Sequence, residues 1–121
     1  MEARQLHPGE FHVTRRQHGN VSVLALAGEL DMATSPRLDE ALDGVAHDGP
    51  IVLDLGELEF IDSHGLHTIL ARAATLDLTL ARPQANVARL LTLIEGARLV
   101  PIHDTLDAAL AAVDNGRDRG A

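Results

Sequence analysis

The sequence lacks cysteine, lysine, tyrosine and tryptophan, and its only aromatic side chains are Phe11 and Phe60. Without cysteine there are no disulfides and no thiolate chemistry, which is compatible with a reducing compartment. Without lysine there is neither Schiff-base catalysis nor a P-loop lysine. Two aromatic side chains provide no stacking platform for bases, and a net charge of −8 disfavours docking on a phosphate backbone. We therefore expect no direct nucleic-acid partner.

Long hydrophobic runs are also missing, because no window approaches the roughly twenty apolar residues that a membrane helix needs. The first residues, MEARQLHPGE, lack the basic and then apolar pattern of a secretion signal. These absences favour a cytoplasmic protein without a membrane partner. With 121 residues and 45% hydrophobic content, one domain is the natural expectation. We place it at residues 9–114, between flexible termini at 1–8 and 115–121, and expect a monomer.

Apolar patterns predict five strands. Two nearly continuous apolar runs, residues 21–27 and 51–55, are typical of strands that are covered on both faces. Residues 11–13 alternate before a turn at 18–20 and predict an edge strand. Leu76, Leu78 and Leu80 alternate with polar residues, which predicts another strand. The short piece 99–102 contains Pro101 and belongs at an edge or a strand end.

Four segments show apolar residues at helical spacing, so each has one apolar and one polar face. Ser35 followed by Pro36 suggests a cap before the first helix, and Gly96 is placed to end the third. The predicted order is β-β-α-β-α-β-α-β-α, an α/β fold with a mixed sheet and helices packed on it. The four apolar stripes are Leu38–Val45, Leu66–Ala73, Val87–Ile94 and Leu106–Val113.

The stretch FIDSHGLHTIL, residues 60–70, combines the end of a strand, a short loop and the start of a helix. Asp62 is of the type that caps helices by accepting backbone N–H groups. Ser63 would then begin the helix, with its hydroxyl beside donors that lack intrahelical partners. Such a helix start can receive an anion, although an Asp-Ser pair in this position is more often only a cap.

The chain resembles a STAS domain of the anti-sigma factor antagonist family in three motifs, which occur in the same order as in that family. They are the sequence GELD at 28–31, the approach from 52–55 into Asp62-Ser63-X-Gly65-Leu66, and the segment 90–96 ahead of Leu99. The resemblance implies a STAS-like fold over nearly the whole folded unit. It implies phosphorylation of Ser63, and partner binding by the set Asp31, Asp62, Ser63, His64, Gly65 and Leu66.

The resemblance also implies a function by partner switching. In that family an anti-sigma factor that is also a serine protein kinase phosphorylates the antagonist, and only the unphosphorylated antagonist binds it and releases the sigma factor. A phosphatase would restore the active form, and no cofactor is implied. The chain departs from the family pattern at one position: many members have a second serine where this chain has His64. We expect this difference to affect which kinase partner is accepted.

Other functions are weighed against this one. Asp62, Ser63 and His64 are the residue types of a hydrolase triad, but neighbouring residues do not face one another as a triad requires. A G-x-S-x-G elbow is excluded by Ile61, so we expect no enzyme activity. His64 and His67 lie one turn apart without an HExxH pattern, so no metal site is expected. A STAS module that binds a nucleotide, a lipid or a transport or stress-assembly partner, without phosphorylation, remains the alternative.

Overall fold

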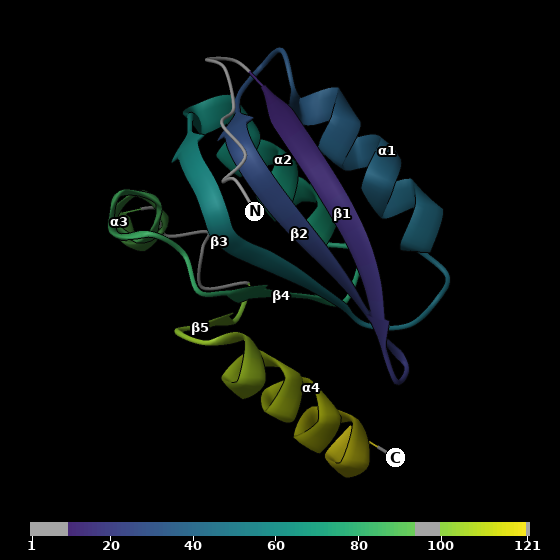
Figure 1. The fold of residues 1–121 in the computed structure, drawn as a ribbon. Helices are drawn as coiled ribbons and strands as arrows, with labels where there is room; N and C mark the ends of the chain where they lie inside the picture. Colours follow the sequence, from purple (N-terminus) through teal and green to yellow (C-terminus); the bar gives the residue numbers. More distant parts are fainter. Residues whose placement is uncertain (1–9, 94–99, 121) are drawn as a thin grey trace, which may run out of the picture.

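The fold, seen in a computed structural model, is a five-stranded sheet with helices on both faces (Figure 1). The structure describes residues 10–93 and 100–120, and side chains up to 114. Its strands are β1 (Phe11–His18), β2 (Val21–Leu30), β3 (Ile51–Ile61), β4 (Leu78–Ala81) and β5 (Ile102–His103). Its helices are α1 (Ser35–Val45), α2 (Ser63–Ala73), α3 (Ala85–Leu93) and α4 (Leu106–Gly120). The predicted order of elements is confirmed.

The sheet is mixed and follows the chain, with the strands in the order β1-β2-β3-β4-β5. Strand β1 pairs antiparallel with β2, whereas β2, β3, β4 and β5 are parallel neighbours. The predicted edge strand is therefore β1, and the two continuous apolar runs form the interior strands β2 and β3. Because β2 to β5 are parallel, β2 and β3 end at the same edge of the sheet, where the segment after Phe60 begins.

Two apolar clusters, one on each face, form the core. The larger cluster joins Leu53 and Leu80 of the sheet to the apolar stripes of α1, α2 and α3. The smaller cluster joins Val23 and Val52 to the stripe of α4. Coverage on both faces explains why all four residues of β4 are buried, including Thr79, although its sequence alternates.

Several boundaries differ from the sequence expectations. Strand β3 runs on to Ile61, six residues beyond the expected Leu55. Helix α4 includes residues 115–120, where the sequence favoured a flexible tail. Gly96, the expected end of the third helix, lies outside the described residues, as does residue 99. The domain limits at 9 and 114 stay a prediction.

No described helix has the length and apolar character needed to cross a membrane.

Candidate functional site

The candidate site lies where β3 is followed by α2. The helix begins two residues after the strand ends, so the strand fixes the position of Asp62 and Ser63. Asp62 is extended, with φ −103° and ψ −179°, and its carboxylate Oδ1 accepts the Gly65 N–H at 2.8 Å. Its carbonyl accepts the Leu66 N–H at 3.0 Å, the first hydrogen bond of the helix. The predicted cap is confirmed, and Ser63 is the first helical residue.

Ser63 is the serine that the fold leaves accessible. The other two serines, Ser22 and Ser35, are 0% and 2% exposed. Ser63 and its neighbour His64 are both exposed, and the Ser63 hydroxyl makes no hydrogen bond within the described part of the chain. The hydroxyl therefore stands free at a helix start, where the backbone dipole favours negative charge.

Gly65 and Leu66 lie beneath this surface. A Cβ on Gly65 would be 2.6 Å from the Leu30 carbonyl oxygen, so the helix touches the backbone of β2 at this point. Leu66 is 3% exposed and belongs to the larger core cluster. The structure thus brings the predicted residues 62–66 together, but it exposes Ser63 and His64 and uses Gly65 and Leu66 to seat the helix.

Asp31, the predicted site residue on the neighbouring loop, organises that loop. Its Oδ1 accepts the backbone N–H groups of Ala33 and Thr34, both at 3.0 Å. The Thr34 hydroxyl accepts the Asp31 N–H at 2.9 Å and donates to the Glu29 carbonyl at 2.8 Å. The loop therefore has its shape from internal bonds, with Asp31 half-buried in it.

The start of α1 differs from the prediction that Ser35 caps it. Thr34 is the N-cap residue, and Ser35 is already helical. The Ser35 hydroxyl donates instead to the Asp31 carbonyl at 2.6 Å. The reason is that Asp31 already bonds the backbone of Ala33 and Thr34, which turns the chain one residue earlier.

One hydrogen bond joins this loop to the Ser63 segment, from the Asp62 N–H to the Leu30 carbonyl at 3.1 Å. Two exposed apolar side chains flank this junction. Met32 is 68% exposed and lies two residues after Leu30, and Phe60 is 46% exposed and lies two residues before Asp62. We call Met32, Phe60, Asp62, Ser63 and His64 the junction surface. Sequence reasoning missed Met32 and Phe60 as surface residues, because Phe60 was counted as part of the apolar approach to Asp62.

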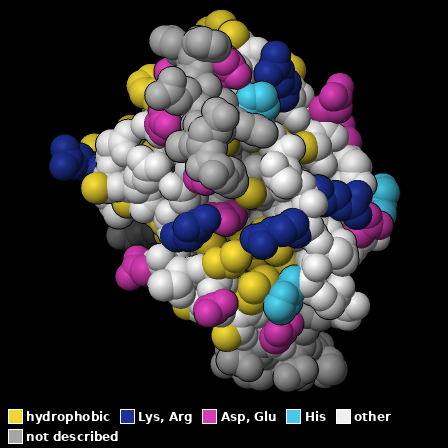
Figure 2. Space-filling model, in the orientation of Figure 1, with side chains coloured by type: hydrophobic (Ala, Val, Ile, Leu, Met, Phe, Trp, Pro, Cys, Tyr) yellow, Lys and Arg dark blue, Asp and Glu magenta, His cyan; other side chains and the backbone are white. Residues whose placement is uncertain are grey.

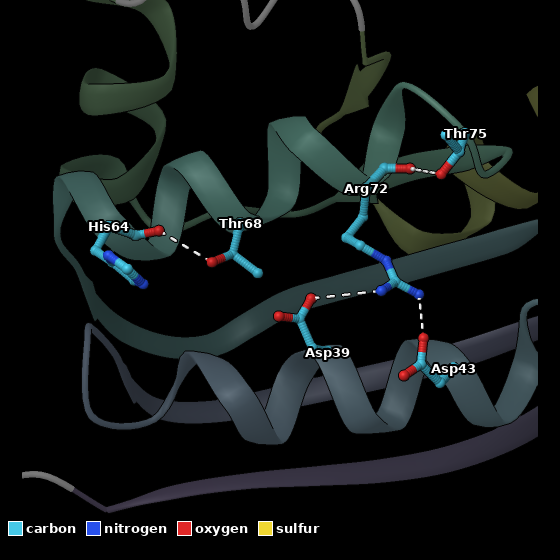
Figure 3. A network of polar contacts seen from close by, with 6 residues as sticks. All are labelled: Asp39, Asp43, His64, Thr68, Arg72 and Thr75. Atoms are coloured by element: carbon cyan, nitrogen blue, oxygen red, sulfur yellow. Dashed lines mark hydrogen bonds and ion pairs between the residues drawn. The ribbon is translucent and has the colours of Figure 1, made fainter.

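Helix α2 is also tied to α1 by charge, as Figure 3 shows. Arg72 forms an ion pair with Asp43 at 2.5 Å and a longer one with Asp39 at 3.7 Å. At the other end of the helix, Figure 3 shows the Thr68 hydroxyl on the backbone carbonyl of His64, at 3.1 Å. The His64 side chain takes no part in that bond. The Arg72 ion pairs therefore hold the C-terminal part of α2 against α1, and the His64 ring makes no hydrogen bond with a described residue.

A buried carboxylate supports β3 where it extends beyond β4. Asp54 is 2% exposed, and its two oxygens accept Arg82 Nε at 2.7 Å and Nη2 at 3.1 Å. The hydrogen bond and the charge of Asp54 raise the pKa of Arg82 above its ordinary value. Past this pair, Gln84 and Asn86 donate amide hydrogens to the Gly56 and Glu59 carbonyls. Side chains thus replace the missing neighbour strand.

Two alternatives, a hydrolase triad and a metal site, can be compared with the geometry. The Asp62 carboxylate holds the Gly65 N–H rather than the His64 ring, so the three triad residue types are not joined in a relay. Within residues 10–93 and 100–120, no group of three or more His, Cys, Asp or Glu side chains could hold a metal ion. On the face seen in Figure 2, the arginines are interspersed with acidic side chains and histidines rather than gathered in one patch.

Comparison with known proteins gives consistent matches. The model of the STAS domain family matches residues 12–109. An anti-sigma F factor antagonist from Paenibacillus polymyxa is 31% identical over 113 residues, which cover 86% of this chain and 96% of that protein. The crystal structure of an anti-sigma factor antagonist from Mycobacterium paratuberculosis superposes with a TM-score of 0.81 at 30% identity. That match covers 89% of this chain and 97% of the other.

A third relative matches over a shorter stretch. The anti-sigma-F factor antagonist RsfB of Mycobacterium tuberculosis is 39% identical over 66 residues. These residues are 53% of this chain and 54% of RsfB, so the match spans about half the length of that relative.

Proposed function

Because the chain belongs to the STAS domain family, in the group of the anti-sigma factor antagonists, we propose that it binds an anti-sigma factor and thereby releases a sigma factor. Binding takes place on the junction surface, and the protein acts as a partner rather than as an enzyme. The anti-sigma factor is a serine protein kinase that modifies Ser63, and a phosphatase restores the hydroxyl. All three proteins work in the cytoplasm.

One observation carries the switch. Ser63 is the exposed serine of the chain, at the first position of a capped helix, while Ser22 and Ser35 are buried. A kinase can therefore reach the Ser63 hydroxyl without unfolding the domain. The added phosphate brings close to two negative charges and three acceptor oxygens to the junction surface.

The same charge has opposite effects on the fold and on the interface. At the start of α2 the helix dipole favours it by about 0.3–1 kcal/mol, so the domain tolerates the modification. A bound partner would have to bury the charge, and an unpaired buried charge is costly. Phosphorylation therefore blocks binding without disturbing the structure.

Two apolar side chains support a protein partner over a small ligand. Met32 and Phe60 are the exposed large apolar residues at this edge of the sheet, on either side of the Leu30 to Asp62 hydrogen bond. Exposed apolar side chains beside polar ones are typical of protein interfaces. The hydroxyl of Ser63 lies three residues after Phe60 on the same surface and can fit against a flat partner only while it is uncharged.

The test uses substitutions at Ser63, with the cognate kinase, ATP and a binding assay. Wild type should gain one phosphate and Ser63→Ala none. Ser63→Ala should still bind, because the hydroxyl contributes about 0.5–1.5 kcal/mol at most. Ser63→Asp should bind at least about tenfold more weakly, a difference of about 1.4 kcal/mol. Ser63→Asn is the matched control, because it has the size of aspartate without the charge, and it should bind nearly as wild type does.

Thermal unfolding of all four proteins accompanies the binding assay. The melting temperatures should agree closely, because small polar or acidic residues suit the first turn of a helix. Should Ser63→Asp melt with wild type and bind just as tightly, charge gating is wrong. If Ser63→Asn and Ser63→Asp lose affinity equally, the larger side chain rather than its charge weakens binding. The charge-gating mechanism is then also wrong.

A further inference from the structure

The exposed face of the first turns of α2 carries a second histidine. Ser63, His64 and His67 are all exposed, while Gly65, Leu66, Thr68 and Ile69 are buried. His67 comes four residues after Ser63, and the function proposed above gives it no role. It is therefore a basic side chain on the same surface as the modified hydroxyl.

Helix geometry places His67 beside Ser63. Residues four apart are neighbours on a helix surface, with Cβ atoms about 5–6 Å apart, whereas adjacent residues point in different directions. Side chains on a helix also lean toward its N-terminus, so an imidazole at position 67 extends toward the turn that contains Ser63. His64, although adjacent in sequence, points away from Ser63 around the helix axis.

His67 is free to take a partner. Its ring makes no hydrogen bond or ion pair with any described residue. The elements packed against α2 include α1 and β3, and Arg72 of α2 is already paired with Asp39 and Asp43. No charged side chain of α1 or β3 forms a hydrogen bond or ion pair with the His67 ring; these side chains are Arg37, Asp39, Glu40, Asp43, Asp54, Glu57 and Glu59. The nearest charge in sequence on the Ser63 side is the Asp62 carboxylate, which holds the Gly65 N–H.

We propose that His67 is the intramolecular partner of a phosphate on Ser63, donating a ring N–H to a phosphate oxygen when the imidazole is protonated. This rests on the proposed modification of Ser63. A protonated imidazole carries a positive charge and three acceptor oxygens surround the phosphorus, so the pair would be a charge-assisted hydrogen bond within α2.

The experiment avoids the kinase, so that it does not depend on the partner. Phosphoserine is incorporated at position 63 during synthesis of the full chain, and its second ionisation is followed by 31P NMR as the pH is varied. A cation at His67 stabilises the dianion, so the midpoint should lie about 0.15–0.35 pH unit lower in wild type than in His67→Gln. His67→Arg, which carries a permanent cation, should keep the low midpoint, and 1 M salt should reduce the difference.

His64→Gln is the matched control, because it removes an exposed imidazole one residue from the phosphate. Its midpoint should equal that of wild type. The proposal is overturned if His67→Gln and wild type titrate at the same pH, or if His64→Gln alone moves the midpoint. Failure of the kinase to label wild-type Ser63 would instead contradict the proposed function, and the NMR titration would still decide the role of His67.

Discussion

Three aspartates in or next to the interior strands β2 and β3 have three different structural roles. Asp62 caps α2 through the Gly65 N–H, and Asp31 shapes the preceding loop through two backbone N–H groups. Asp54 is buried and pairs with a side chain, Arg82. Only Asp62 and Asp31 lie on the two segments that meet at the junction surface, and the carboxylate of each accepts backbone N–H groups there.

At the residue scale, His64 determines partner preference if it touches the partner. We expect His64→Ser to weaken binding of the cognate anti-sigma factor by about 0.5–1.5 kcal/mol, because the imidazole contact is lost. Stability should change by less than about 0.5 kcal/mol, since the ring is exposed and Thr68 bonds only the backbone of residue 64. Calorimetry at fixed salt measures the first and urea unfolding the second. Equal affinity would place His64 outside the interface.

Arg82 gives a second prediction at this scale. Arg82→Met leaves the Asp54 carboxylate buried without its partner and should lower the free energy of unfolding by about 2–3 kcal/mol, less than for a fully buried pair because Arg82 is half exposed. Adding Asp54→Asn should recover part of the loss, because the buried group is then neutral. Urea unfolding provides the values.

Arg15→Met is the control for this pair. It breaks an ion pair with Asp48 in which both side chains are about half exposed, and should change stability by less than about 0.5 kcal/mol. Equal losses for Arg82→Met and Arg15→Met would mean that burial of Asp54 does not matter.

At the scale of single elements, the position of α2 depends on how closely its first turn approaches β2. The contact between Gly65 and the Leu30 backbone sets that approach, and the Arg72 ion pairs hold the other end of the helix against α1. The phosphorylation that we propose for Ser63 would therefore act on a helix that is held at both ends. This favours a switch that changes surface charge over one that moves the helix.

Gly65→Ala tests this arrangement. The added Cβ would lie 2.6 Å from a backbone oxygen, so α2 must shift, and we expect a loss of about 1–3 kcal/mol in stability together with weaker partner binding. Gly44→Ala is the matched control in α1, where a Cβ meets nothing within 4 Å. It should raise stability by about 0.5–1 kcal/mol, the usual gain of alanine over glycine in a helix. Thermal and urea unfolding of both variants would show the opposite signs, and the same sign for both would contradict the close contact.

For the whole molecule, β2 and β3 are long interior strands of the sheet and lie within the core. Each strand has hydrogen-bonded neighbours on both sides. In the N-terminal half of each strand, the larger apolar cluster covers one face and the smaller cluster covers the other. The junction surface lies at the far ends of these strands. We therefore expect the core around β2 and β3 to be the most stable part of the domain and the junction surface to lie at its edge.

Hydrogen exchange and one core substitution test that view. Amides of residues 21–27 and 51–55 should be among the slowest to exchange, because they open only with global unfolding. Leu53→Ala should cost about 2–5 kcal/mol, since Leu53 is 0% exposed and contacts the larger cluster. Leu93→Ala, at a leucine that is 73% exposed, should be nearly neutral. Fast exchange in β3 or a neutral Leu53→Ala would place the core elsewhere.

The sequence by itself determined the order of elements, the interior position of β2 and β3, and the cap of α2, because periodicity and capping depend on residues close together in the chain. Only the tertiary structure decided that β4 is buried on both faces and that Arg82 pairs with Asp54. It also placed Met32 and Phe60 around one junction. These features join residues far apart in sequence, or depend on which strands become neighbours, and local patterns contain neither kind of information.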